Sequence, residues 1–357
     1  MNRVYIIAEA GVNHNGQLDL AREMIHQAAN AGVDAVKFQT FIAEEVISRH
    51  APKAPYQEQS TPTGESQLEM VLGLQFDEAQ HRDLLCICQS RGIEFISSPF
   101  DLASVDLLAS RLKLPLIKVA SGEITNFPLL LKTARTGAKI LLSTGMCGLG
   151  DIENALSVLA FGYCAGNCRP SPAAFRESYS SPAGQWALKR KVTLLHCTSE
   201  YPAPFEEINL QAIDTLSHAF TLKVGYSDHS QGIVVPIAAA ARGAVVIEKH
   251  FTLDRGLPGP DHQASLEPSE LRAMVKAVRQ VEKALGSSLK FSTQSESKNL
   301  PLVRKSLVAR KDIRRGEVFT EDNLGIKRPG SGLSPIHYWD YLGRTSERDY
   351  QTDEEIV

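Results

Sequence analysis

The sequence predicts an α/β protein built on a TIM (β/α)8 barrel, followed by a small C-terminal module. The first observation is a regular alternation of short β-branched apolar runs with segments of helical length, which gives eight β/α units in about 285 residues. The second is that polar side chains stand where the apolar runs end, as expected when the carboxyl ends of parallel strands meet at one mouth. The third is an ordinary globular composition, 43% hydrophobic and 22% charged, in a chain of 357 residues.

The expected strands begin with residues 4–9, an apolar run that is more simply a first buried strand than a signal peptide. Further strands are expected at residues 35–39, 93–98, 116–119, 139–143, 192–197, 223–226 and 245–248. Helices are expected at residues 18–31 and 267–285. Helices after the 51–67 loop are expected to run to about residue 91, and others are expected to begin at residues 102, 128, 151, 208 and 233. The last helix is indicated by helical spacing of Leu271, Val275, Val278, Val281 and Leu285.

The segments outside this alternation set the expected domain boundaries. These are residues 1–286 for the barrel, 287–301 for a polar linker and 302–357 for the C-terminal module. The module has about 55 residues, which is small for an independent core. Residues 51–67 are long enough to form a functional lid. Residues 163–190, rich in Pro, Ser and Gly, form an insertion that is expected to be helical near residues 173–179.

Charge and cysteine usage exclude several classes of protein. The net charge of −3 gives no support for binding to nucleic acid or to an anionic membrane, so an anionic substrate needs a local cationic pocket. No apolar stretch approaches the roughly 20 residues of a membrane span. The six cysteines lack the framework of a small secreted domain, which predicts a reduced, cytoplasmic protein. Cys164 and Cys168 have no second pair spaced to complete a zinc site.

Two histidines close the last two expected strands. His229 follows the run at residues 223–226, and His250 follows the run at 245–248. Consecutive parallel strands place their carboxyl ends side by side, so both imidazoles can converge on one ion. With histidine and oxygen donors and no cysteine nearby, that ion would be Mn²⁺, Co²⁺, Mg²⁺ or Zn²⁺. A single histidine at a strand end is more often a hydrogen-bonded rim residue, and it is the pairing that favours a metal site.

The other strand ends carry the groups of an anion pocket. They are Glu9, Lys37, Gln39, Ser97, Ser98, Lys118, Ser121, Glu123, Ser143 and His196. Lys37 and Lys118, with serine hydroxyls and backbone amides at a Gly145 turn, form a receptacle for a phosphate with an adjacent carboxylate. For either lysine alone, a structural salt bridge to a barrel carboxylate is the competing explanation. Beside a metal-polarised aldehyde, such an anion suggests carbon–carbon bond formation.

Many ordered motifs of this chain closely resemble the sialic acid synthase family: IIAEAGVNHNG, AVKFQTF, SSPFD, IKVASGE, LLSTGM, LLHCTSEYPAP, VGYSDHS, IEKHFT, PGPDH and KRPGSG. The family includes N-acetylneuraminate synthases and the related legionaminate and pseudaminate synthases. The resemblance implies a barrel joined to an antifreeze-like (SAF) domain in a domain-swapped homodimer. It also implies condensation of phosphoenolpyruvate with an amino sugar, with loss of phosphate by C–O cleavage, and a divalent metal cofactor, Mn²⁺ ahead of Mg²⁺ or Co²⁺.

The resemblance also assigns roles motif by motif. It places the metal on His229 and His250, proton transfer on Glu9 or Glu123, and catalytic roles on both pocket lysines. It places phosphoenolpyruvate on Lys37, Ser98, Lys118, Ser121, Ser143, Gly145, Ser199 and Ser227. It places the sugar on Gln39, Tyr201, Asp261 and Arg328, with Arg328 reaching in from the partner subunit. Ser98 stands where many members have Thr, and Ser199 stands where an amide side chain occurs elsewhere in the family.

Which amino sugar is used stays open at this point, because these motifs are shared. N-acetylmannosamine is the first expectation, which would make the protein an N-acetylneuraminate synthase, and a 2,4-diacetamido-2,4,6-trideoxyhexose is the alternative. Two other classes compete. One is a barrel aldolase in which Lys118 forms an imine, which borohydride trapping with pyruvate would detect. The other is a non-catalytic binding protein built around the C-terminal module, whose activity would survive removal of both histidines.

Overall fold

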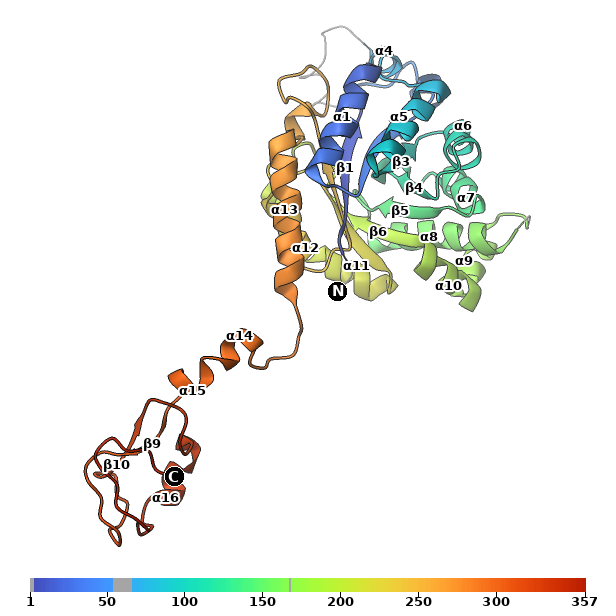
Figure 1. Ribbon diagram of the computed structural model, residues 1–357. Coiled ribbons are helices and arrows are strands. Elements are labelled where there is room, and N and C mark those ends of the chain that lie inside the picture. The colour runs from blue at the N-terminus through green and yellow to red at the C-terminus, as the bar shows by residue number, and fades with distance from the viewer. Residues whose placement is uncertain (1–2, 54–65, 167) are drawn as a thin grey trace. The chain divides into compact units, whose positions relative to one another are not determined.

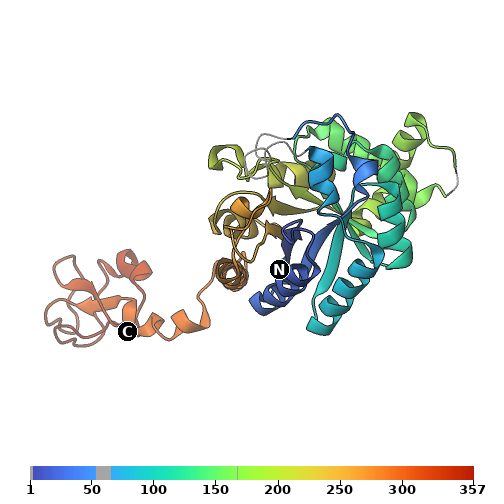
Figure 2. The ribbon, with the colours of Figure 1, turned by 90° about the horizontal axis from the view of Figure 1, so that it is seen from above.

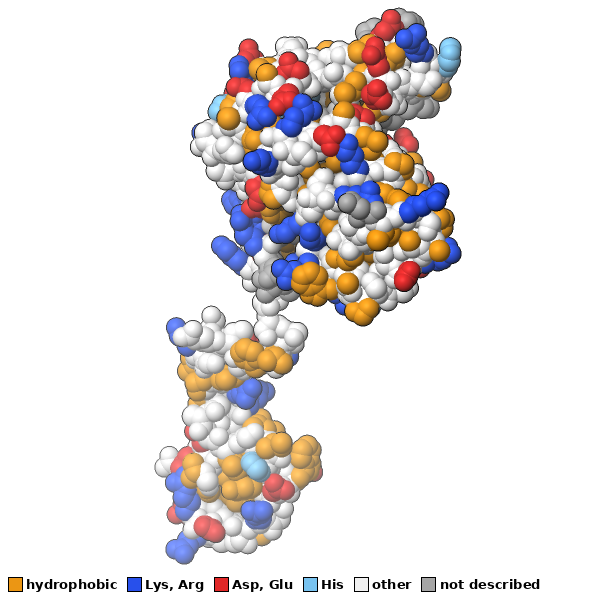
Figure 3. Space-filling view, turned by 90° about the vertical axis from the view of Figure 1, so that its right-hand side faces the viewer, with side chains coloured by type: hydrophobic (Ala, Val, Ile, Leu, Met, Phe, Trp, Pro, Cys, Tyr) orange, Lys and Arg blue, Asp and Glu red, His pale blue; other side chains and the backbone are white. Residues whose placement is uncertain are grey.

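The computed structural model describes residues 3–53, 66–166 and 168–357. The chain divides into two compact units, Met1–Gly286 and Ser287–Val357. Most of the lid predicted at residues 51–67 lies outside the described residues. Across the described residues, no helix combines the length and the apolar character needed to cross a membrane. Basic, acidic and apolar side chains are interspersed over the surface seen in Figure 3.

Eight parallel strands form the sheet of the first unit, in the order β3-β2-β1-β8-β7-β6-β5-β4. They are β1 (Tyr5–Gly11), β2 (Ala35–Thr40), β3 (Glu94–Pro99), β4 (Leu116–Val119), β5 (Lys139–Ser143), β6 (Val192–His196), β7 (Lys223–Asp228) and β8 (Val246–His250). The two end strands, β3 and β4, also contact each other, so the sheet curls into a nearly closed barrel. The predicted TIM barrel is confirmed, and its helices surround the strands in both ribbon views (Figures 1 and 2).

The outer layer consists of the helices that connect the strands. They are α1 (Leu18–Ala31), α2 (Ala43–Val46), α4 (Gln67–Leu72), α5 (Glu78–Arg91), α6 (Leu102–Val105), α7 (Phe127–Arg135), α8 (Leu149–Cys164), α11 (Ala212–Phe220), α12 (Val234–Ala241) and α13 (Pro268–Leu285). A π-helical segment, η1 (Asp106–Arg111), continues α6, and short 3-10 turns occur at η2 (Ser121–Glu123), η3 (Phe205–Glu207) and η4 (His262–Ala264). The helix expected from residue 208 begins only at Ala212, because η3 and a turn precede it.

The predicted insertion adds two helices to this outer layer. α9 (Pro172–Ser180) matches the expected helix, whereas α10 (Pro182–Lys191) was not predicted. Ser181 explains both boundaries, since it ends α9 and its hydroxyl accepts a hydrogen bond from the Gly184 amide to cap α10. Both helices contact α8 (Figure 1). Phe175 packs edge-on against Phe161 of α8.

The second unit has a small core of its own. β9 (Ser306–Ala309) and β10 (Leu324–Lys327) pair antiparallel, and the short helices are α14 (Gln294–Ser297), α15 (Leu300–Val303), η5 (Pro335–His337) and α16 (Tyr338–Tyr341). The buried side chains of its apolar cluster are Leu307, Ala309, Ile313, Phe319, Leu324, Tyr350 and Ile356. Arg328 directly follows β10 and is exposed on this unit.

Inside the barrel, side chains are arranged in layers, because every second residue of a strand points to the same face. One layer is an apolar cluster of Ile7, Ala35, Ile96, Leu141, Leu195 and Val246. Two residues further along, the same strands carry Glu9, Lys37, Ser98, Ser143, Cys197 and Glu248. The strand period therefore places a polar layer directly on an apolar one, at the carboxyl ends of the strands.

Candidate active site

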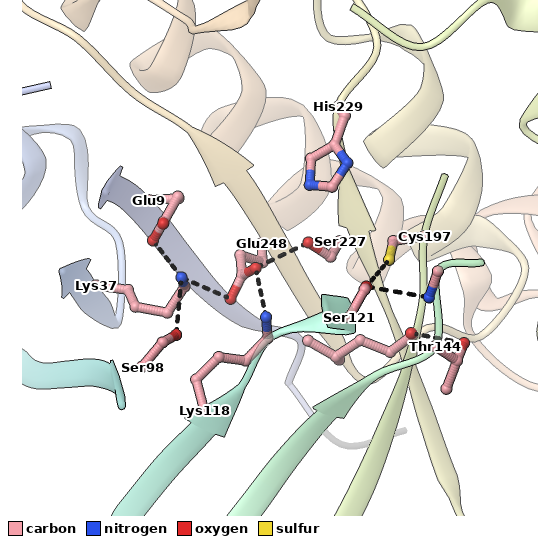
Figure 4. Close-up of polar contacts among 12 residues, drawn as sticks. Glu9, Lys37, Ser98, Lys118, Ser121, Thr144, Cys197, Ser227, His229 and Glu248 are labelled. Atoms are coloured by element: carbon pink, nitrogen blue, oxygen red, sulfur yellow. Dashed lines mark hydrogen bonds and ion pairs between the residues drawn. The ribbon is translucent and has the colours of Figure 1, made fainter. Parts of the chain in front are cut away.

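A buried network of charges forms the centre of this polar layer (Figure 4). The Lys37 ammonium lies 2.7 Å from Glu9 Oε2 and 4.0 Å from Glu248 Oε2. Lys118 Nζ lies 3.2 Å from Glu248 Oε1, which also accepts a hydrogen bond of 2.8 Å from the Ser227 hydroxyl. All four charged side chains are buried. Each strand contributes its group because its apolar neighbour two residues earlier is fixed in the barrel core.

The two carboxyl groups of this network titrate differently. Burial raises the pKa of Glu9 to about 7, with Lys37 opposing the rise and Glu248 adding to it. Burial also raises the pKa of Glu248, but Lys118 and Lys37 outweigh it and bring the value down to about 2. Burial lowers the pKa of Lys37, yet Glu248 and Glu9 leave it above its usual range. Glu248 is therefore a fixed negative charge, and Glu9 can gain or lose a proton near neutral pH.

The two predicted histidines lie together beside the network. The ring centroids of His229 and His250 are 5.3 Å apart, and Tyr201 packs against both rings at 4.2 and 5.4 Å. Burial lowers the pKa of His229 to about 4 and that of His250 well below its usual range, so both imidazoles are neutral. Neutral imidazole is the form that binds metal ions.

The hydrogen bonds of the two rings are compatible with a divalent metal. His229 Nδ1 donates to the Thr198 carbonyl oxygen at 2.6 Å, which fixes its tautomer and leaves Nε2 with a lone pair. Nδ1 of His250 is buried and has no hydrogen-bond partner. Among residues 3–53, 66–166 and 168–357, no cluster of three or more His, Cys, Asp or Glu side chains is arranged to hold a metal. The donor set therefore fits an open site with two protein ligands.

A group of hydroxyls lies near the ends of β4 and β5. The Ser121 hydroxyl accepts a hydrogen bond of 3.1 Å from the Gly145 amide and lies 3.0 Å from Cys197 Sγ. Ser143 Oγ is buried without a hydrogen-bond partner. A β-carbon on Gly145 would lie 2.3 Å from Ser199 Oγ and 2.8 Å from Ser121 Oγ, so only glycine fits between these serines.

A cavity of about 430 Å³ opens at this end of the barrel. The predicted site residues that line it are Glu9, Lys37, Gln39, Ser98, Lys118, Ser121, Ser143, Ser199, Tyr201, Ser227, His229, His250 and Asp261. Asp261 is buried, and burial raises its pKa to about 6 while Lys37 lowers it. Chain segments that lie far apart in the sequence thus contribute to one cavity, which is what a shared barrel mouth requires.

Other predicted residues lie outside the lining of this cavity. Glu123 accepts a hydrogen bond of 2.8 Å from the Asn126 side chain, and burial raises its pKa. His196 pairs with the Ile208 carbonyl at 2.6 Å, and Ser97 pairs with the Thr40 hydroxyl at 2.6 Å. Gly145 does not itself line the cavity, but its amide donates a hydrogen bond to Ser121, which does. Arg328 belongs to the second unit.

Sequence reasoning missed two features of the cavity. Glu248 was not among the predicted site residues, although its place two residues before His250 signals the same inward face. The second feature is an apolar wall, contributed by residues 41–47 and 67–74 together with Phe100. No periodic signal in the sequence connects these segments with the strand ends.

A parallel barrel that gathers lysines, carboxylates and paired neutral histidines in one cavity at its strand ends belongs to the class of TIM-barrel enzymes. Residues 24–290 match the NeuB family, and residues 304–356 match the SAF domain. The chain belongs to the NeuB family. It is an enzyme of the sialic acid synthase type, a phosphoenolpyruvate-dependent transferase that forms a carbon–carbon bond.

Individual relatives agree with this assignment over most of their length. The N,N'-diacetyllegionaminic acid synthase of Campylobacter jejuni is 50% identical over 356 residues, which cover 100% of this chain and 99% of that protein. The enzyme of the same name from Legionella pneumophila is 42% identical, over 95% of this chain and 89% of its own. The crystal structure of N-acetylneuraminic acid synthetase from Leptospira borgpetersenii has a TM-score of 0.67 at 33% identity, covering 84% of this chain and 90% of that one.

Proposed function

We propose that the protein condenses phosphoenolpyruvate with a 2,4-diacetamido-2,4,6-trideoxyhexose and thereby makes a legionaminic-type nine-carbon 2-keto-3-deoxy acid. N-acetylmannosamine was the first expectation from the motifs. The relatives that carry the legionaminic name are 50% and 42% identical to this chain, against 33% for the neuraminic acid synthetase structure, and they favour the alternative acceptor. The observation that carries the chemistry is the pair of buried lysines in one cavity with two neutral histidines.

Phosphoenolpyruvate suits the polar floor of the cavity. Each lysine ammonium has three N–H donors, and Lys118 pairs with the Glu248 carboxylate at 3.2 Å. The remaining donors, the Ser98, Ser121, Ser143 and Ser227 hydroxyls and the Gly145 turn would hold the phosphate and carboxylate oxygens. Charge-assisted hydrogen bonds of this kind are roughly twice as strong as neutral ones, and the buried site strengthens them further.

His229 and His250 would hold the divalent metal, which we propose to be Mn²⁺, with Mg²⁺ or Co²⁺ as alternatives. A bound metal supplies a Lewis acid that polarises the aldehyde oxygen of the open-chain sugar. The chain itself keeps the imidazoles neutral by burial and fixes the His229 tautomer through the Thr198 carbonyl.

The bond changes of the proposed reaction balance without a redox partner. The electron pair of the C2–C3 π bond of phosphoenolpyruvate forms the bond from C3 to the sugar aldehyde carbon, and water adds at C2. The two protons of this water balance those gained by the aldehyde oxygen and by the departing phosphate. The resulting tetrahedral carbon loses phosphate through cleavage of the C–O bond and leaves the 2-keto group. Lys37 and Lys118 would stabilise the charge that develops at the phosphate and carboxylate oxygens.

Glu9 is the better candidate for proton transfer. It lines the cavity, and its pKa of about 7 suits a group that exchanges a proton near neutral pH. Glu123 does not line the cavity, and the Asn126 side chain already donates to its carboxylate. Gln39, Tyr201 and Asp261 also line the cavity and would contact the sugar.

The assembly belongs to the same proposal. We propose a domain-swapped homodimer in which Arg328 of one subunit contacts the sugar bound by its partner, and a cytoplasmic location for the enzyme. The exposed Arg328 guanidinium offers five donors in a rigid fork for hydroxyl and acetamido oxygens. Neither nucleic acid nor a membrane is expected as a partner, given the net charge of −3.

A phosphate-release assay tests the proposed function. With Mn²⁺ and phosphoenolpyruvate, the wild-type protein should release phosphate faster with the 2,4-diacetamido-2,4,6-trideoxyhexose than with N-acetylmannosamine. Phosphoenolpyruvate labelled with ¹⁸O at the bridging position should deliver the label to the phosphate. Label that stays in the sugar acid, or an imine on Lys118 trapped by borohydride in the presence of pyruvate, would instead indicate the aldolase chemistry.

A further inference from the structure

The apolar wall of the cavity is chemically different from its floor, which consists of the buried charged network and the serines around it. The wall consists of Val46, Ile47, Met70, Val71, Leu74 and Phe100. Met70 is buried and the other five are half-buried. Phosphoenolpyruvate carries its phosphate and carboxylate on only three carbons, and the lysines and serines of the floor match those charges. The wall is therefore available to the second substrate.

The wall is built as a unit separate from the barrel core. Val46, Val71, Leu74 and Phe100 pack against the buried residues Val12, Phe41 and Ala43 in an apolar cluster of their own. The start of α2 is fixed by hydrogen bonds from the Ile42 amide to Asp101 and from the Ala43 amide to Gln75, at 2.8 and 2.9 Å. Two separate anchors at one helix start hold the wall in a defined position.

The helix α4 is fixed at both ends. Ser66 and Glu69 form a reciprocal capping box at its start. After its end, the Gly73 carbonyl oxygen lies 2.1 Å from the position that a β-carbon on Gly16 would occupy, so α4 packs closely on the β1–α1 turn. Gly16 has φ +71°, which further favours glycine there. These contacts preorganise the side chains of α4 at the cavity, which lowers the cost of binding an apolar group.

The two candidate acceptors differ in the substituents that would contact such a wall. N-acetylmannosamine has one methyl group, in its acetyl substituent, and a hydroxymethyl group at C6. A 2,4-diacetamido-2,4,6-trideoxyhexose has three methyl groups, two in acetamido substituents and one at C6. A hydroxyl placed against six apolar side chains loses its hydrogen bonds to water without gaining partners, whereas a methyl group gains buried area.

We propose that this wall determines the acceptor specificity of the enzyme, selecting methyl and acetamido substituents over hydroxyls, with Leu74 and Val71 as specificity-determining residues. The inference rests on the proposed condensation reaction and extends it to Val71 and Leu74, which neither the motifs nor the charged layer identify. A single methyl or hydroxyl difference in an apolar pocket typically changes kcat/KM by about 10- to 200-fold.

Three acceptors and three variants test the inference. The acceptors are N-acetylmannosamine, 2-acetamido-2,6-dideoxymannose, which differs from it only at C6, and the diacetamido trideoxy sugar. Leu74→Asn and Val71→Thr introduce a polar group at nearly constant volume. Leu72→Asn is the matched control, because Leu72 belongs to α4 but is 46% exposed and does not line the cavity.

Wild type should prefer the acceptors in the order of their methyl content. Leu74→Asn and Val71→Thr should reduce the ratio of kcat/KM for the trideoxy sugar to that for N-acetylmannosamine at least tenfold. The KM for phosphoenolpyruvate should stay within about twofold of wild type, and Leu72→Asn should leave all values unchanged. If Leu74→Asn does not fold, Val71→Thr decides, because it keeps both shape and volume.

The outcomes separate this inference from the proposed function. An unchanged preference ratio in the folded variants, equal losses for all three acceptors, or the same effect in Leu72→Asn would overturn the specificity role while the condensation stands. Failure of the wild-type protein to release phosphate with any of the three sugars would overturn the condensation, and the specificity role with it.

Discussion

Replacing Glu248 with glutamine tests the charge balance at the centre of the site. The Glu248 carboxylate lies between two ammonium groups, 3.2 Å from Lys118 Nζ and 4.0 Å from Lys37 Nζ, and it accepts a hydrogen bond from Ser227. Glutamine keeps nearly the same shape and can still accept from Ser227, but it carries no charge. The variant leaves the two buried cations with Glu9 as the remaining carboxylate of the network.

The magnitude follows from these distances. At about 4 Å and an effective dielectric constant of about 20, each ammonium–carboxylate attraction is about 4 kcal/mol, and losing one partner of a buried pair costs about 3–5 kcal/mol. We expect Glu248→Gln to lower the Tm by roughly 6–15 °C, at about 2–3 °C per kcal/mol for a protein of this size. Phosphoenolpyruvate restores the missing negative charge and no longer meets repulsion from Glu248. We therefore expect the variant to bind it at least about tenfold more tightly.

Thermal unfolding with and without phosphoenolpyruvate, together with calorimetric titration, measures both effects. The control is Glu206→Gln, the same substitution at an exposed position, which should change neither the Tm nor the affinity. The electrostatic reasoning is refuted if Glu248→Gln unfolds at the wild-type temperature, or if it binds phosphoenolpyruvate more weakly than wild type.

Four further predictions follow from the site and its surroundings. Lys118→Ala should lower kcat/KM for phosphoenolpyruvate by about 30-fold to several thousand-fold, since a buried charge pair loses about 2–5 kcal/mol on truncation; an unchanged value in steady-state assays would return Lys118 to a structural role. His250→Ala should abolish calorimetric Mn²⁺ binding while chelation of wild type abolishes turnover, and wild-type affinity in the variant would refute the metal assignment. His14 is stacked 4.0 Å from Phe76, and its pKa is lowered to about 3, first by burial. Its folded pKa lies below the unfolded value of about 6.5, so its contribution to stability is complete above pH 6.5 and is lost as the pH falls towards 3. Urea unfolding should show that His14→Asn reduces the difference in stability between pH 7 and pH 5 by about 2 kcal/mol, and an unchanged difference would contradict the burial argument. When inactive His250→Ala and Arg328→Ala proteins are mixed, about a quarter of wild-type activity should return after full subunit exchange. If mass spectrometry shows exchange and no activity returns, Arg328 lies outside the partner's site.

The part of the site that lies on strands could be predicted, because side chains of a strand alternate between its two faces with a period of two residues. Lys37 and Ser98 follow the apolar residues Ala35 and Ile96 by two positions, so a strand assignment alone places them on the inner face at the barrel mouth. The same reasoning would have included Glu248, two positions after Val246. His250 lies two positions after Glu248, so the period of the strand places both side chains on the same face.

The loop-borne part could not be predicted in the same way. Glu123 follows a strand by only a few residues, but the 3-10 turn η2 has a different period, and its carboxylate pairs with Asn126 outside the cavity lining. The apolar wall comes from short helices whose sequences contain too few residues for an amphipathic pattern. Long-range contacts place them at the cavity: the end of α4 packs on the β1–α1 turn, and the start of α2 donates hydrogen bonds to Asp101 and Gln75.

Glu9 and Glu248 show how one barrel layer can give two identical groups different roles. They are 1% and 3% exposed, so burial acts on both, yet the pKa of Glu9 is about 7 and that of Glu248 is about 2. The difference comes from their neighbours, because Glu248 pairs with both lysines and accepts from Ser227, while Glu9 pairs with Lys37 and is opposed by the Glu248 charge. Environments that push two pKa values apart are typical of paired acid–base and charge-stabilising groups. In the proposed reaction, Glu248 therefore fixes the lysines that receive the phosphate, and Glu9 is the group of the pair that can exchange a proton.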